Sequence, residues 1–296
     1  MPLADFLKDR TPTAAVGIPA PLLAPGLELT DALRNIGSVE DVPPLTAEKV
    51  DGDKNIFRAS AVGDLCAREE VLAAVHNITR KNTVDPILRT IFDTGTALHD
   101  MVRGYLGRLG VLVGTWACAK CGKKYGKPQE ERIQMPAACA CKATEFLYVE
   151  EYAKDAEHKI GGHCDGFLAF QKRPAESILE IKSIGAGSMQ RVVKEPYMKH
   201  VIQAQIYMWL FNFRRAKILY VAKDWSAAKV SVPELTAPFL EHNVEWDEVL
   251  LGAIKKKLKD VLGGVKNQVV PARIVCGSPT DWRAKDCALR GQCFAP

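Results

Sequence analysis

The sequence predicts an α/β domain, in which amphipathic helices alternate with short apolar strands. A long helix is expected over residues 86–109. Three strand-like segments follow between residues 146 and 183, and an apolar helix over 198–213 precedes a strand at 217–223. Apolar residues make up 47% of the 296 residues and charged residues 25%, an ordinary balance for a globular protein that buries a substantial core.

The first elements are recognised by their ends. Residues 1–54 are rich in Pro, Ala, Leu and Gly without a sustained period, so we expect a loosely ordered N-terminal arm there. A helix capped by Ser60 should follow. The next helix should begin at Asp85 and Pro86, because Asp is a good N-cap and Pro fits the first helical position, and Gly110 should end it. The apolar positions expected in these two helices are Leu65, Val71, Leu72, Val75, Ile87, Ile91, Leu98, Val102, Leu106 and Leu109.

The later elements complete one domain, which we take to span residues 55–296. The three central strands are expected at 146–152, 163–170 and 177–183. An edge strand is expected near residues 229–232, and a long helix over about 238–262. The C-terminal segment 269–296 shows little regular pattern, but it holds three cysteines.

Composition also limits the class of protein. No uncharged apolar run reaches the length of about 18 residues that spans a bilayer. The N-terminus lacks the basic start and apolar stretch of a secretory signal, so we expect an intracellular, cytoplasmic protein. The net charge of +5, from 40 basic and 35 acidic residues, permits an anionic partner without demanding one.

Polar groups interrupt two of the expected central strands. Asp165 lies in one strand, and Glu180 and Lys182 lie in the next. The strand period of two places Glu180 and Lys182 on one face and turns Ile181 toward the core. Two carboxylates and a backbone carbonyl make a hard oxygen site for Mg²⁺ or Mn²⁺, which can activate water against a phosphoryl group. A second Glu-x-Lys, at 157–159, lies in a polar turn and is interpreted as a chance match.

Taken in order, these residues resemble the signature of the PD-(D/E)XK nucleases. Gly95-x-x-x-His99 and Gln203-x-x-x-Tyr207 are similar to two helix motifs of the RecB-like branch, and the resemblance covers about residues 60–230. It implies a restriction-endonuclease-like core, with a central mixed sheet flanked by helices. Where the family often has Pro before the Asp, this chain has Cys164.

The resemblance also implies roles for individual residues. The catalytic metal, Mg²⁺ or Mn²⁺, would be bound by His99, Asp165, Glu180 and the carbonyl of Ile181. Lys182 would orient water or balance charge in the transition state, and Gln203 and Tyr207 would contact DNA beside the active site. The catalytic set is therefore His99, Asp165, Glu180, Lys182, Gln203 and Tyr207.

Four of the nine cysteines lie in one lysine-bearing insert, residues 116–145. The insert has too little core to fold without a cross-link, and two close cysteine pairs predict a structural zinc site. Free thiols and an iron centre are the alternatives. The ligands would be Cys118, Cys121, Cys139 and Cys141. Lys120, Lys123 and Lys124 are then expected to meet DNA phosphates.

A second cysteine group brackets the domain, with one member before the predicted core and three after it. It consists of Cys66, Cys276, Cys287 and Cys293. The arrangement resembles the iron–sulfur staple of AddB and the CRISPR-associated RecB-like nucleases, and it implies a 4Fe-4S cluster joining the two ends of the domain. This chain departs from the pattern, because ten residues rather than two separate Cys276 from Cys287. Four unrelated buried cysteines are the alternative, and Cys164 is left over as a buried small hydrophobe.

The resemblance, which includes phage-encoded relatives, implies a metal-dependent deoxyribonuclease. An exonuclease acting at DNA ends in recombination, repair or CRISPR adaptation is preferred. The sequence contains no Gly-x4-Gly-Lys-Ser/Thr motif, so any ATP-driven unwinding would come from a partner. A recombinase, a helicase or another recombination or CRISPR protein is the candidate partner beside DNA, and the oligomeric state is left open. A structure-specific endonuclease, an inert nucleic-acid-binding module and an iron–sulfur redox protein are the alternatives.

Overall fold

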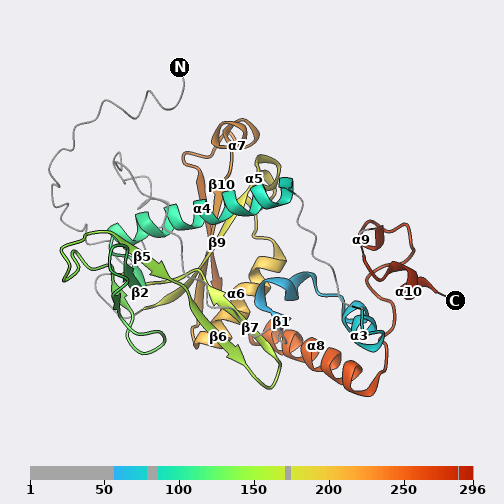
Figure 1. Cartoon of the computed structure of the whole chain (residues 1–296). Helices are drawn as coiled ribbons and strands as arrows, with labels where there is room; N and C mark the ends of the chain where they lie inside the picture. Colours follow the sequence, from blue (N-terminus) through green and yellow to red (C-terminus); the bar gives the residue numbers. More distant parts are fainter. Residues whose placement is uncertain (1–56, 79–85, 171–174, 286, 296) are drawn as a thin grey trace.

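The computed structural model describes residues 57–78, 86–170, 175–285 and 287–295, and it shows a mixed α/β fold (Figure 1). The expected N-terminal arm and the cap at Asp85 lie outside the described residues. The side chains of residues 86–89, Ile87 among them, are not described either. None of the helices in the described parts of the chain is long and apolar enough to cross a bilayer.

The larger of two sheets is built around a parallel pair of long strands. Its order is β11-β10-β9-β8-β2-β3, with β4 and β5 also paired to β2. β9 and β10 run parallel, and the other pairs are antiparallel, so the sheet is mixed as predicted. The strands are β2 (Leu112–Cys118), β3 (Lys124–Tyr125), β4 (Ile133–Gln134), β5 (Phe146–Val149), β8 (Gly166–Leu168), β9 (Ser177–Ile184), β10 (Arg215–Ala222) and β11 (Phe239–Glu245).

The smaller sheet supplies one wall of the site described below. It has the order β1-β7-β6, with β1 parallel and β6 antiparallel to β7. Its strands are β1 (Phe57–Arg58), β6 (Glu151–Asp155) and β7 (Ile160–Cys164). Two of the expected strands therefore divide between sheets. The segment 146–152 breaks at Glu150, and the segment 163–170 breaks at Asp165.

Helices cover both faces of the larger sheet (Figure 1). They are η1 (Ala59–Asp64, 3-10), α3 (Ala67–Val75), α4 (Pro86–Arg108), α5 (Ala186–Val192), α6 (Met198–Phe211), α7 (Trp225–Ser231), α8 (Glu248–Asn267), α9 (Trp282–Lys285) and α10 (Arg290–Phe294). Among them, α4 lies on one face of the sheet and α6 on the other, whereas α3, α9 and α10 lie away from it on the side of the C-terminus (Figure 1). Alternate side chains of β9 point to opposite faces of the sheet and pack into two hydrophobic cores. Ile178 packs with α6 on one face, whereas Leu179 and Ile181 pack with α4 on the other, so Ile181 points into the core as expected.

Of the two helices predicted near the N-terminal end, one needs correction and the other is confirmed except for one apolar position. The helix expected from Ser60 is instead the short η1 followed by α3, whose N-cap is Cys66. Gly63 explains the break, because η1 lies so close to α6 that a Cβ there would be 2.6 Å from the Cα of Lys199. The helix from Pro86 is confirmed and ends before Gly110, which has a φ of +69°. Ile91, expected in its apolar stripe, is 46% exposed.

Two predictions are wrong near the other end. The edge strand expected at 229–232 belongs to α7 instead, because the Asp224 carboxylate caps that helix by accepting from the Ala227 N–H at 3.0 Å. The helix expected over 238–262 begins ten residues late, since 239–245 forms β11 along the open edge of β10. Asp247 caps the true helix, α8, and accepts from the Leu250 N–H at 2.9 Å.

Candidate active site and metal centres

Asp165 lies where the chain passes from the smaller sheet to the larger one. It stands between β7 and β8, and its Oδ2 accepts a hydrogen bond of 2.7 Å from the Ile181 N–H on β9. The preceding Cys164 is buried, and its thiol donates to the Gly166 carbonyl at 3.1 Å. The flanking strands β7 and β8 fix the backbone on both sides of Asp165, and the hydrogen bond from the Ile181 N–H holds its carboxylate beside β9.

One cavity of about 890 Å³ gathers the predicted catalytic side chains. Its lining includes all six of them, namely His99, Asp165, Glu180, Lys182, Gln203 and Tyr207. They come from α4, the β7–β8 break, β9 and α6. Glycines permit this convergence: a Cβ on Gly95 would be 3.1 Å from Ser183 Oγ, and one on Gly162 would be 2.9 Å from the Tyr207 ring.

A chain of polar contacts runs from β9 to α6. Lys182 Nζ lies 2.6 Å from Glu180 Oε1 and donates to Gln203 Oε1 at 2.9 Å. Gln203 Nε2 in turn donates to the Tyr207 hydroxyl at 3.3 Å. Gln203 is almost fully buried, so the spacing Gln203-x-x-x-Tyr207 places two polar groups on the apolar helix α6 where they meet Lys182.

The two carboxylates have opposite electrostatic environments. Burial raises the pKa of Glu180 to about 8, helped by the charge of Asp165 and opposed by Lys182. Burial also disfavours the charged form of Asp165, but His99 and Arg103 outweigh it and lower the pKa of this carboxyl below its usual range. Glu180 is 1% exposed, and its Oε2 has no hydrogen-bond partner among the described residues. A buried carboxylate oxygen without a partner is costly, unless a cation binds it.

Sequence reasoning missed an arginine at the base of this site. Arg103 is 2% exposed, and its Nη2 donates to Asp165 Oδ1 at 2.7 Å and to Glu150 Oε1 at 2.6 Å. Its Nε donates to the Asp165 carbonyl at 2.9 Å, and its Nη1 donates to Asp100 at 3.1 Å. Arg103 follows His99 by four residues and so shares its helix face, a spacing that could have revealed it.

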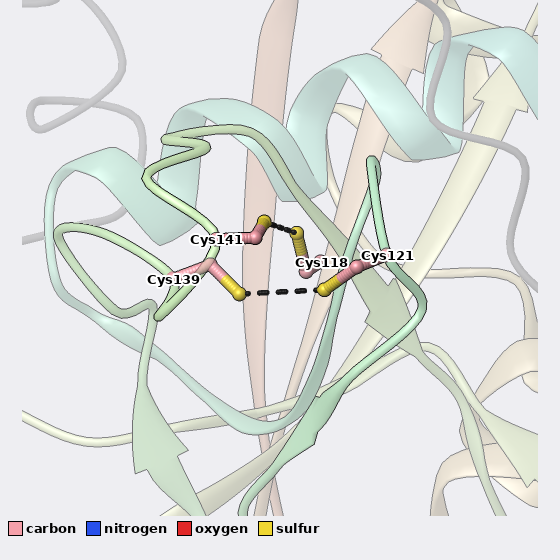
Figure 2. Close-up of side chains that lie close together, drawn as sticks. All are labelled: Cys118, Cys121, Cys139 and Cys141. Atoms are coloured by element: carbon pink, nitrogen blue, oxygen red, sulfur yellow. Dashed lines mark hydrogen bonds between the residues drawn. The ribbon is translucent and has the colours of Figure 1, made fainter.

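The cysteines of the insert form a compact group of four (Figure 2). All four Sγ atoms lie within 4.8 Å of one another; Cys118 and Cys141 are 3.6 Å apart, and Cys121 and Cys139 are 3.5 Å apart. These separations are too long for disulfides. They are close to the roughly 3.8 Å between thiolates at the corners of a zinc tetrahedron with Zn–S bonds of about 2.3 Å.

A tyrosine supports this group from outside. The Tyr125 hydroxyl donates to Cys139 Sγ at 3.2 Å, and this hydrogen bond is the main cause that lowers the pKa of Cys139 to about 6. Cys139 is therefore favoured as a thiolate, whereas at Cys121 the effect of the Lys123 backbone is outweighed by the hydrogen bonds with the other three cysteines, which raise the pKa of Cys121 to about 12. The side chains of Lys120, Lys123 and Lys124 are exposed on the insert, but no described residue of the insert lines the 890 Å³ cavity.

The second cysteine group lines a different cavity, of about 740 Å³. Cys66, Cys276, Cys287 and Cys293 all contribute to its wall, although Cys66 precedes α3 and the other three follow α8. Arg68 bridges the two ends of the domain by donating to Cys293 Sγ at 3.3 Å and to the Pro271 carbonyl at 2.7 Å. Their sulfurs do not converge as closely as those of the insert, which form the one compact four-ligand group in the described ranges.

Comparison with known proteins gives resemblances of fold only. No family model matches the sequence, and no curated protein matches it. An alkaline exonuclease from Laribacter hongkongensis is 14% identical with a TM-score of 0.42, and the match covers 72% of this chain and 89% of that one. A phage-related exonuclease from Haemophilus somnus 129PT is 14% identical with a TM-score of 0.40, covering 72% and 95%. The structure of SSO0001 is 14% identical with a TM-score of 0.39, covering 83% and 89%. At this level of similarity, the activity has to be inferred from the side chains of the chain itself.

Proposed function

We propose that this chain is a metal-dependent deoxyribonuclease of the PD-(D/E)XK type, in its RecB-like branch, that hydrolyses phosphodiester bonds at DNA ends. One observation carries the proposal: a single cavity gathers His99, Asp165, Glu180 and Lys182 from elements far apart in the sequence. The exonucleolytic mode is favoured by the sequence resemblance to nucleases that process ends, and a structure-specific endonuclease is the alternative.

The residues present suit a hard divalent cation. Asp165 and Glu180 offer carboxylate oxygens, and His99 Nδ1 lies 3.3 Å from Asp165 Oδ1, so imidazole and carboxylate can face one ion. The unpartnered Oε2 of Glu180 is the strongest sign of fit, because it is a buried acceptor that a cation would satisfy. Such a cation would be Mg²⁺ or Mn²⁺, held by His99, Asp165, Glu180 and the Ile181 carbonyl.

The chain's own residues would then position the reacting groups. When bound, the metal supplies activated water and polarises a phosphoryl oxygen. Asp165 cannot rotate, because the Ile181 N–H and Arg103 hold its two oxygens. Lys182 is tethered between Glu180 and Gln203 at the cavity wall, where its ammonium group can orient the attacking water or offset charge on the pentavalent transition state.

The two cysteine groups are proposed as structural metal sites of the same enzyme. The compact group fits one zinc ion, held by Cys118, Cys121, Cys139 and Cys141. The wider cavity lined by Cys66, Cys276, Cys287 and Cys293 suits a 4Fe-4S cluster, because a cubane stands between its ligands and holds their sulfurs further apart than a single ion does. DNA is the proposed substrate, with phosphate contacts from Lys120, Lys123 and Lys124 as a further part of the proposal.

An inert nucleic-acid-binding module is disfavoured by the energetics of the site. A binding surface has no need of a 1% exposed carboxylate with an unpartnered oxygen, which costs stability unless it serves chemistry.

The test is cleavage of 5′- and 3′-labelled single and double strands with Mg²⁺ or Mn²⁺. Wild-type protein should release labelled products, and Asp165→Ala should abolish cleavage, because it removes a metal ligand and the partner of Arg103. DNA binding should persist. Asp247→Ala, which removes the cap of α8 and changes no residue of the cavity lining, is the control for a merely destabilised fold. Unchanged cleavage by Asp165→Ala would overturn the proposed function.

A further inference from the structure

Two apolar side chains are exposed at the wall of the active-site cavity. On α4, Ile91 is 46% exposed and Phe92 is 52% exposed, and both line the cavity that holds the catalytic carboxylates. Other exposed large apolar side chains, such as Val230 and Val249, lie outside that cavity. An aromatic ring left accessible beside a catalytic centre is a candidate for ligand contact.

Further rings and two cations also line the cavity. Tyr152 and His163 on the smaller sheet contribute rings whose centroids are 4.9 Å apart. Arg58 and Lys223 line the cavity and are exposed, and Lys223 Nζ lies 3.5 Å from the Ile91 carbonyl. The cavity therefore combines the carboxylates of Asp165 and Glu180 with aromatic rings and positively charged side chains. Stacking rings with neighbouring cations are the chemistry that binds single-stranded nucleic acid.

We propose that Phe92, with Ile91 beside it, is a base-stacking subsite for an unpaired nucleotide of the DNA substrate. The inference rests on the proposed function and adds to it the form of the substrate. The interior faces of paired bases are covered by their neighbours, so a ring can stack in this way only on a terminal or an unpaired base. The substrate at the active site is therefore a single strand or a frayed end.

The position on α4 fixes the distance of this subsite from the metal ligands. Phe92 precedes His99 by seven residues, which is about 10 Å along the helix axis at about 1.5 Å per residue. Stacked nucleotides advance about 3.4 Å each along a strand. For a strand that runs along α4, the stacked base would lie about three nucleotides from the phosphate that is cut.

The test compares an oligonucleotide with bases to one without them. Binding of fluorescent (dT)₁₂ and of an abasic backbone of equal length is measured by anisotropy in the non-cleaving Asp165→Ala background. Phe92→Ala should weaken (dT)₁₂ binding by about 5- to 150-fold, the range that corresponds to one lost base–aromatic stack, while abasic binding stays unchanged. Phe92→Trp should restore the affinity, and Phe92→Leu should not.

Val249→Ala is the matched control, because Val249 is 84% exposed on α8 and does not line the cavity. Equal binding of (dT)₁₂ by Phe92→Ala and its parent would overturn the stacking subsite, and so would an equal loss on both oligonucleotides. The proposed function fails differently. Wild-type protein that cuts no DNA with Mg²⁺ or Mn²⁺, yet binds (dT)₁₂ through Phe92, would refute the nuclease and leave the subsite standing.

Discussion

The two cysteine groups use the same ligand type in opposite ways. The insert group is local in sequence, and its four Sγ atoms already lie within 4.8 Å of one another. The terminal group joins Cys66 to cysteines that follow α8, and its members line a cavity of about 740 Å³ without closing on a point. On the proposed assignments the two groups have different tasks: the first would order a small insert from within, and the second would join distant parts of one domain.

The comparison also separates what each site should do to stability. The insert packs on the main core, because Trp116 is fully buried and Tyr125 and Ile133 lie against the cluster that holds Ile181 of β9. The proposed zinc would therefore order the loops of the insert rather than replace a core. The proposed iron–sulfur cluster would add to a packing already made by α3 with α8 and α10, and it would restrict a long loop in the unfolded chain. Loss of the second site should therefore be felt across the molecule, whereas loss of the first should stay local.

The largest effect is expected from Cys287→Ala. Protein purified without oxygen should lose its brown colour and its iron. A cross-link that closes a loop of over two hundred residues is worth about 5 kcal/mol in the entropic model. At about 2–4 °C per kcal/mol, the melting temperature should fall by roughly 10–20 °C. Iron analysis and thermal denaturation measure both changes. If the wild-type protein is colourless, contains no iron and melts at the same temperature as the variant, the terminal cysteines do not hold a stabilising cluster.

A smaller and more local effect is expected from the double variant Cys118→Ser/Cys121→Ser. About one zinc per chain should be lost while iron is retained, because the four cysteines of the insert and the lining of the 740 Å³ cavity share no residue. Hydrogen exchange should accelerate over residues 116–145 and remain slow in β9 and β10. Zinc content equal to that of wild type would contradict the assignment of the insert.

Cys164→Ala is the control for both experiments. Cys164 is buried, it belongs to neither group, and its thiol donates only within the sheet, to the Gly166 and Leu179 carbonyls. The variant should keep both metals.

The smallest effects should come from the side chains that donate to one sulfur in each group. Tyr125 donates to Cys139 at 3.2 Å, and Arg68 donates to Cys293 at 3.3 Å. Tyr125→Phe should weaken zinc affinity by about 10- to 100-fold without affecting iron, since partners of metal ligands contribute on that scale. Arg68→Met should lower the stability of the iron site without affecting zinc. Competition with a chelator measures the first, and the rate of iron loss in air measures the second. Faster iron loss in Tyr125→Phe, or weaker zinc binding in Arg68→Met, would show that the two sites are coupled.

Much of the candidate site could be predicted from the sequence because its signals are local and periodic. The alternation in β9 correctly placed Glu180 beside Lys182 and turned Ile181 toward the core. Arg103 was missed because its significance depends on Glu150 and Asp165, which are distant in sequence. The spacing from His99 indicates the helix face of Arg103, but its two carboxylate partners are known only from the folded chain.

The errors in the fold have the same origin. The β-branched residues of 229–232 favoured a strand, but the cap at Asp224 and the packing of α7 on α5 made a helix. The segment 239–245 became a strand because β10 offered an unpaired edge, which no local pattern reveals. The sequence also does not reveal that the chain passes from one sheet to the other at Asp165, because the segments before and after this residue read as one continuous strand.

The packing of α3 against α8 and α10 has a consequence for biosynthesis. A ribosome that adds about 5–20 residues per second makes α3 roughly 10–40 s before the last cysteines, which lie about 200 residues further on. Until α8 has been made, the buried face of α3, with Val71 and Leu72, lacks its main partner, although the cavity-lining side chains from His99 to Tyr207 have already been synthesised. The carboxylate cavity can therefore be assembled before the last cysteines are added, so the proposed iron–sulfur cluster would be the last part of the domain to form.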